Sequence, residues 1–130
     1  MKYTLLVFIS GFIIINISIA QEIEHNYLVG PQVTDCDSLT IHGLSMPESI
    51  SKIRTAKFRF DQSFRLTRKQ GLQLGEYYSC NGKDGFLIIK YDGIESLYVT
   101  VSMDIWKGLI SSSDPEYYFL EIKPQLQKHH

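Results

Sequence analysis

The side chains most often used in catalysis are few and scattered in this sequence. The four histidines are His25, His42, His129 and His130. None of them stands in a recognised spacing with a serine, a cysteine or a carboxylate. The chain also contains no G-x-S-x-G, no H-E-x-x-H and no glycine-rich phosphate loop. We therefore expect a non-catalytic protein without catalytic residues, cofactor or metal. An enzyme whose site is assembled from distant residues stays an alternative.

The first twenty residues have the pattern of a secretory signal peptide. Lys2 gives a positive start, residues 5–15 are mostly apolar, and Ser18 and Ala20 place small residues before a cut. We expect cleavage to leave Gln21 as the first residue of an exported protein, periplasmic or secreted, with no membrane span. A retained anchor is the alternative, because the uncharged stretch just suffices to span a bilayer, but no basic stop signal follows it.

Two cysteines, Cys36 and Cys80, lie in the part that would remain after cleavage. An oxidising compartment makes a disulfide between them the default. The alternative is a reactive or metal-binding thiol pair. The sequence has no C-x-x-C spacing and no histidine close to either cysteine, so we predict a structural disulfide.

Basic residues gather within 18 positions of the chain. An alternating pattern over 56–67 predicts one long or bent strand with an apolar, aromatic side and a basic side. Lys57, Arg59 and Arg65 share the basic side. They would form a positive patch able to bind a protein or an anionic glycan or phosphate surface. The alternative is a solvated sheet face whose charges oppose aggregation.

Two tyrosines are further binding candidates. Tyr77 and Tyr98 have the opposite parity to the apolar residues of their strands, so we expect both on the surface, where they would suit protein or glycan recognition. The mature chain would hold 12 basic and 14 acidic residues, a formal charge of −2. That balance gives no reason to expect nucleic acid as a partner.

The remaining patterns predict the elements that would position these residues. Ser45 and Glu48 have capping-box spacing and start a short helix, and Ser102 is a suitable N-cap for a second helix anchored by Trp106. We predict an α+β fold: a mostly antiparallel sheet of four or five strands, a C-terminal helix packed on one face and a short N-terminal helix. The expected ranges are helices at 46–55 and 102–112 and strands at 56–67, 73–80, 86–91 and 96–101.

The domain organisation follows from these elements. Residues 1–20 are the expected signal peptide and 21–44 an irregular N-terminal arm. A single α+β domain covers 45–123, and 124–130 form a polar tail that we expect to fray.

Residues 76–123 resemble the KTSC domain, a module named after its place at the C-terminus of some lysyl-tRNA synthetases. The resemblance implies three strands followed by a helix and an aromatic closing motif, and it brings no catalytic residues. The residues that carry it are Leu87-Ile88-Ile89-Lys90-Tyr91-Asp92-Gly93, Tyr98-Val99-Thr100-Val101, Ile105, Trp106, Leu109, Ser113 and Tyr118-Phe119. We expect a small exported binding module of this kind, with a ligand that the sequence does not identify.

A second likeness suggests an alternative function. Tyr78-Ser79-Cys80, followed by a glycine-containing turn and an apolar strand, is similar to periplasmic C-type lysozyme inhibitors. That likeness implies an inhibitor or immunity-type protein directed at a lysozyme-like hydrolase or a toxin. Such a protein would present a turn rigidly, and residues 81–85 are the candidate.

Overall fold

The fold is known from a computed structural model that describes residues 34–130. The expected signal peptide and most of the arm at 21–44 lie outside the described residues. The described part contains a five-stranded sheet in which every neighbouring pair is antiparallel, in the order β1-β2-β3-β4-β5. This confirms the predicted α+β class. The strands are β1 (Phe60–Arg65), β2 (Leu72–Ser79), β3 (Asp84–Tyr91), β4 (Ile94–Ser102) and β5 (Gln127–Lys128).

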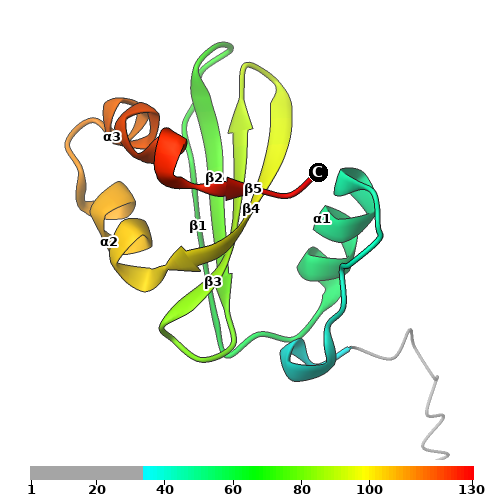
Figure 1. The fold of residues 1–130 in the computed structure, drawn as a ribbon. Coiled ribbons are helices and arrows are strands. Elements are labelled where there is room, and N and C mark those ends of the chain that lie inside the picture. The colour runs from blue at the N-terminus through cyan, green and yellow to red at the C-terminus, as the bar shows by residue number, and fades with distance from the viewer. Residues whose placement is uncertain (1–33) are drawn as a thin grey trace, which may run out of the picture. The chain divides into compact units, whose positions relative to one another are not determined.

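Helices cover both faces of this sheet (Figure 1). Helix α1 (Met46–Thr55) packs on one face, where Ile50 and Ile53 meet Ile88 and Leu97. Helices α2 (Met103–Ser111) and α3 (Pro115–Ile122) pack on the other. Burial of apolar side chains on two faces therefore gives this small domain two cores.

The predicted helix starts are confirmed in detail. Ser45 Oγ accepts from the Glu48 backbone N–H, and the Glu48 carboxylate accepts from the Ser45 N–H, which completes the capping box of α1. The Ser102 hydroxyl accepts from Ile105 N at the start of α2. The fully buried Trp106 anchors α2, and its Nε1 donates to Gln62 Oε1 at 2.9 Å. Gln62, the one polar residue on the aromatic side of β1, thus satisfies the indole N–H.

The single strand predicted over 56–67 is wrong at its start. The backbone of Lys57 pairs with Thr34 and Cys36 instead of β2, and β1 begins only at Phe60. The chain changes course between the two pairings. Phe58 consequently packs against Tyr78 on the α1 face, at a centroid distance of 5.3 Å, whereas Phe60 packs with the opposite core.

The polar tail does not fray as expected. Residues 127–128 form β5 at the edge of the sheet, and the His129 backbone N–H donates to Leu97 O at 2.8 Å. Before it, the 3-10 turn η2 (Lys123–Gln125) reverses the chain after α3. Main-chain pairing therefore holds a polar segment that hydrophobic patterning could not place. Within residues 34–130 no helix has the length and apolar character needed to cross a membrane.

Candidate functional site

The three basic residues predicted to form one patch do not meet. Lys57 and Arg59 precede β1, and the Arg59 guanidinium lies 3.6 Å from the Asp37 carboxylate. Arg65 ends β1, and the six residues of that strand span about 20 Å at the usual rise per residue. The predicted contiguous patch is therefore wrong, because the strand separates its members and an acid pairs with one of them.

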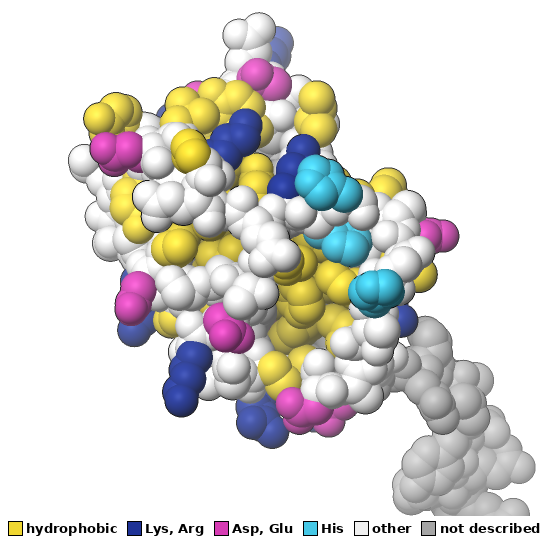
Figure 2. Space-filling view, viewed as in Figure 1, with side chains coloured by type: hydrophobic (Ala, Val, Ile, Leu, Met, Phe, Trp, Pro, Cys, Tyr) yellow, Lys and Arg dark blue, Asp and Glu magenta, His cyan; other side chains and the backbone are white. Residues whose placement is uncertain are grey.

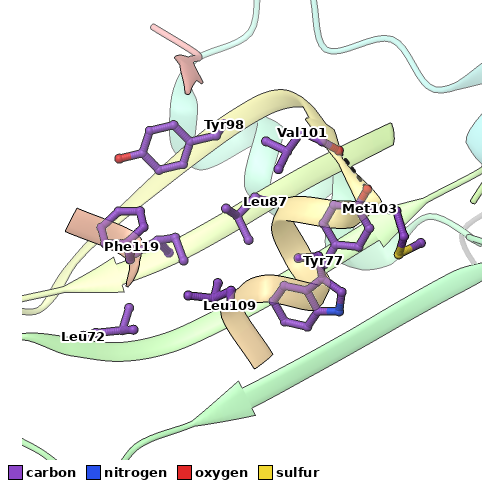
Figure 3. Packing of buried hydrophobic residues seen from close by; sticks show 10 residues of the cluster. Leu72, Tyr77, Leu87, Tyr98, Val101, Met103, Leu109 and Phe119 are labelled. Atoms are coloured by element: carbon purple, nitrogen blue, oxygen red, sulfur yellow. Dashed lines mark hydrogen bonds between the residues drawn. The ribbon is translucent and has the colours of Figure 1, made fainter. Parts of the chain in front are cut away.

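The two tyrosines predicted on the surface are buried. Tyr77 is 0% exposed, stacks on Trp106 at a centroid distance of 5.4 Å, and donates its hydroxyl to Val101 O at 2.8 Å. Tyr98 is 3% exposed and packs against Phe119. Figure 3 shows both rings in the cluster under α2 and α3. The surface prediction is wrong because helices cover both faces of the sheet, so neither parity of these strands points to solvent.

Arg65 instead lines a basic pocket formed with the loop after β1. The pocket has a volume of 440 Å³ and lies at the end of β1. Its lining holds four cationic side chains and no acidic one. We define the basic pocket by its lining residues: Arg65, Leu66, Thr67, Arg68, Lys69, Gln73, Leu74 and Lys90.

Strand register explains how distant residues meet in the basic pocket. Arg65 of β1 pairs with Leu74 of β2, and Leu74 pairs with Lys90 of β3. Paired residues of antiparallel strands project from the same face, with Cβ atoms about 5 Å apart. Arg65 and Lys90 therefore flank the buried Leu74, about 10 Å from each other at the Cβ atoms. An anion bound over this row would have a cationic side chain on either side, Arg65 and Lys90, and the apolar side chain of Leu74 beneath it.

The acidic residues next to the basic pocket are already paired. Glu95 of β4 continues the same row beyond Lys90, and the Arg54 guanidinium of α1 contacts Glu95 at 2.7 Å and Glu76 at 2.7 Å. The hydrogen bond with Glu95 is the main reason why the pKa of Arg54 is raised, and Glu76 adds to it. Because Arg54 compensates these carboxylates, they compete less for Lys90.

The loop that forms the pocket wall is held by side chains. Gln73 donates to Arg68 O at 2.9 Å and accepts from Gly93 N at 2.7 Å. The Arg68 guanidinium pairs with Glu116 of α3, which also accepts from the Tyr91 hydroxyl at 2.9 Å. Arg68 therefore positions the loop. Arg65, Lys69 and Lys90 form no ion pair with any described residue and remain available to a ligand.

The sequence missed Lys90 as a partner of Arg65, and it placed Lys69 in the same basic stretch as Arg65 but not in the predicted patch. Lys90 is the one charged residue in the apolar segment 86–91. That contrast was a usable signal, because a lysine on a central strand needs either water or an anion. The register that places Lys90 beside Leu74 follows an irregularity in the strand pairing between Leu72 and Leu74. No sequence pattern predicts this irregularity.

A second feature is the rigid turn between β2 and β3. The Ser79 hydroxyl donates to Asp84 O at 2.6 Å and accepts from Gly82 N at 2.9 Å. The Asn81 side-chain oxygen accepts from Lys83 N at 2.9 Å and from Asp84 N at 3.0 Å. Residues 81–84 are all exposed. This turn is therefore both presented to solvent and fixed by four hydrogen bonds.

The predicted disulfide joins Cys36 to Cys80 at the base of this turn. Cys36 lies in the 3-10 turn η1 (Cys36–Ser38), so the crosslink ties the N-terminal arm to the end of β2. Asp37 lies within 4.8 Å of both sulfur atoms. The three groups do not form a metal site in this state, because disulfide sulfurs are not thiolate ligands.

A serine–histidine pair lies near the start of α1. Ser49 Oγ is 3.1 Å from His129 Nε2, and Leu44 O is 3.2 Å from the same nitrogen. A carbonyl only accepts, so the contact with Leu44 assigns the proton to Nε2. Ser49 is fully buried. A protonated Nε2 cannot act as a base toward the Ser49 hydroxyl. The contact between His129 and Ser49 is therefore structural and holds the C-terminal segment against α1.

No family model matches this chain, and no curated protein or solved structure matches it significantly.

Proposed function

We propose that this chain is a small exported, non-catalytic binding module whose basic pocket holds an anionic ligand, a phosphorylated or acidic sugar. The observation that carries this proposal is the row of Arg65, Leu74 and Lys90 across three adjacent strands, with Lys69 beside it. Cations with an apolar floor between them suit a ligand that combines a charged group with a sugar ring.

The size and rigidity of the pocket support this ligand class. Its 440 Å³ falls within the range of small-molecule sites. The hydrogen bonds of Gln73 fix the loop before a ligand arrives, so binding costs little ordering of the backbone. Arg65 and Lys69 are exposed and Lys90 is half-buried. Their partial exposure makes the attraction sensitive to salt.

Export is part of the proposal and rests on the sequence. The signal pattern at 1–20 and the Cys36–Cys80 disulfide are both compatible with an oxidising compartment. The resemblance of residues 76–123 to the KTSC domain stays a prediction. It supports a binding role but does not identify the ligand.

The proposal is tested by calorimetric titration with glucose 6-phosphate, using glucose as the neutral control. We expect binding of the phosphate ester only, weaker at high salt. Lys90→Gln should weaken it by about three- to tenfold, as expected for one charge-assisted contact at a partly exposed site. The matched control is Lys107→Gln, an exposed lysine of α2 outside the pocket. If glucose bound as tightly as glucose 6-phosphate, the proposal would be contradicted. An equal loss of affinity in Lys90→Gln and Lys107→Gln would also contradict it.

A second candidate function is inhibition of a lysozyme-like hydrolase. The rigid turn at 81–84 favours it, because protease-inhibitor-like recognition gains from a loop ordered before contact. Lys83 has an exposed side chain at the tip, so Lys83→Glu changes the charge of the turn without removing its backbone hydrogen bonds. In a lysozyme lysis assay we expect the protein to slow lysis and Lys83→Glu to relieve that effect. Lysis at the same rate with and without the protein would exclude this candidate for lysozyme.

A further inference from the structure

A separate hollow lies on the α2–α3 face, between the β3–β4 hairpin, α3 and β5. We refer to it as the aromatic hollow; it has a volume of 240 Å³. Centroid distances of 6.2 Å from Tyr91 to Phe119 and 6.0 Å from Tyr98 to Phe119 define its wall. Ile94 at its mouth is 69% exposed. A cavity of about 150 Å³ accepts a benzene molecule, so this hollow has room for one ring and a short polar group.

The Tyr98 hydroxyl is the unusual group of the aromatic hollow. The ring of Tyr98 is packed in the core, with 3% of the residue exposed, and its hydroxyl makes no direct hydrogen bond with a described residue, in contrast to the hydroxyls of Tyr77 and Tyr91. Figure 3 shows it pointing away from the cluster. Burial raises the pKa of Tyr98, and the neighbouring Ser96 hydroxyl offsets part of that rise. Within residues 34–130 no fully buried side-chain oxygen or nitrogen lacks a hydrogen-bond partner, so this hydroxyl keeps contact with solvent. It is therefore a neutral donor that can bind a ligand acceptor in place of water.

Two lysines border the same hollow. Lys128 of β5 is the register partner of Tyr98, so their side chains leave the sheet on the same face about 5 Å apart at Cβ. Lys123 of η2 is also in the lining, and neither lysine forms an ion pair within residues 34–130. The one acid in the lining, Asp92, accepts from the Gly71 backbone N–H. Figure 2 shows basic side chains bordering apolar surface near α3 and β5.

We propose that the aromatic hollow binds a small single-ring aromatic carboxylate. The ring packs against Tyr91, Phe119 and Ile94, and the carboxylate accepts from the Tyr98 hydroxyl and pairs with Lys128. Offset or edge contacts between rings add to the burial of apolar surface, and a hydrogen bond to a charged acceptor is stronger than one between neutral groups. This site is distinct from the basic pocket and does not depend on the function proposed for that pocket.

The test is a titration of the purified full chain with phenylacetate, followed by backbone amide NMR. We expect shifts at residues 94–98, 119 and 128. Phenylacetamide, which keeps the ring and removes the charge, should bind at least tenfold more weakly. Tyr98→Phe removes only the hydroxyl and should weaken phenylacetate about tenfold, as for loss of a hydrogen bond to a charged group. Lys128→Gln should weaken it less, and Lys107→Gln should leave it unchanged.

Three results would overturn this inference. Shifts confined to residues 65–69 and 90 would place the anion in the basic pocket. Equal affinity for phenylacetate and phenylacetamide would show that the carboxylate is not recognised. An unchanged affinity in Tyr98→Phe, in a variant whose amide spectrum shows an intact fold, would remove the role of the hydroxyl. Failure of glucose 6-phosphate to bind would contradict the function proposed for the basic pocket and would leave the inference about the aromatic hollow unaffected.

Discussion

Replacing both cysteines by serine should cost this domain much of its stability. Cys36 and Cys80 are 44 positions apart, so the crosslink closes a loop of 45 residues. Chain entropy assigns such a loop about 4 kcal/mol of stabilisation, because the crosslink restricts the unfolded chain. Domains of this size have about 5–15 kcal/mol in total. The expected fall in melting temperature of Cys36→Ser/Cys80→Ser is therefore about 15–30 °C.

Urea unfolding followed by circular dichroism measures this effect directly. We expect a lower free energy of unfolding and a steeper denaturant dependence, because the uncrosslinked unfolded chain exposes more surface. The unmodified protein treated with a reductant is the control and should match the double variant. A loss below about 1 kcal/mol with an unchanged slope would refute the chain-entropy reasoning, and a mismatch with the reduced protein would assign the effect to the serines.

Two further perturbations concern single contacts. Tyr77→Phe removes the donor to Val101 O and should cost about 1–2 kcal/mol. Burial raises the pKa of Tyr77 to about 12, so as the pH rises the unfolded chain loses this proton before the folded protein does. The stabilisation should be complete below about pH 10 and should be lost between about pH 10 and pH 12. In Tyr77→Phe the free energy of unfolding should fall less steeply over the same pH range. His129→Ala removes the contact with the buried Ser49 and should cost about 1–2 kcal/mol, whereas the exposed His130→Ala should change stability by under about 0.5 kcal/mol in the same thermal scan. Equal effects of the two histidine changes would mean that the C-terminus is not docked.

The fold could be predicted where local signals and hydrophobic periodicity agree. The capping box of Ser45 and Glu48 placed the start of α1, and Ser102 with Trp106 placed α2 and its buried side. Residues 127–128 have neither signal, because edge pairing depends on main-chain groups that every sequence carries. The early start assigned to the first strand failed for a related reason: Lys57 satisfies its backbone with the arm instead of the sheet.

The candidate site was only partly within reach of the sequence. Arg65 was identified, but Lys57 and Arg59, the other two members of the predicted patch, lie before the start of β1. Its spatial neighbours come from strand register, which couples residues 65, 74 and 90 across three strands. Tyr98 was assigned to the surface because parity distinguishes two faces and cannot tell whether a helix covers each of them.

Amide NMR mapping of glucose 6-phosphate binding tests the central claim most directly. If the basic pocket holds the anionic ligand, the shifts should gather at residues 65–69, 73–74 and 90, and they should vanish in Lys90→Gln combined with Arg65→Gln while Lys107→Gln keeps them. Saturable shifts at residues 80–85 or elsewhere, or none at millimolar ligand, would contradict the account.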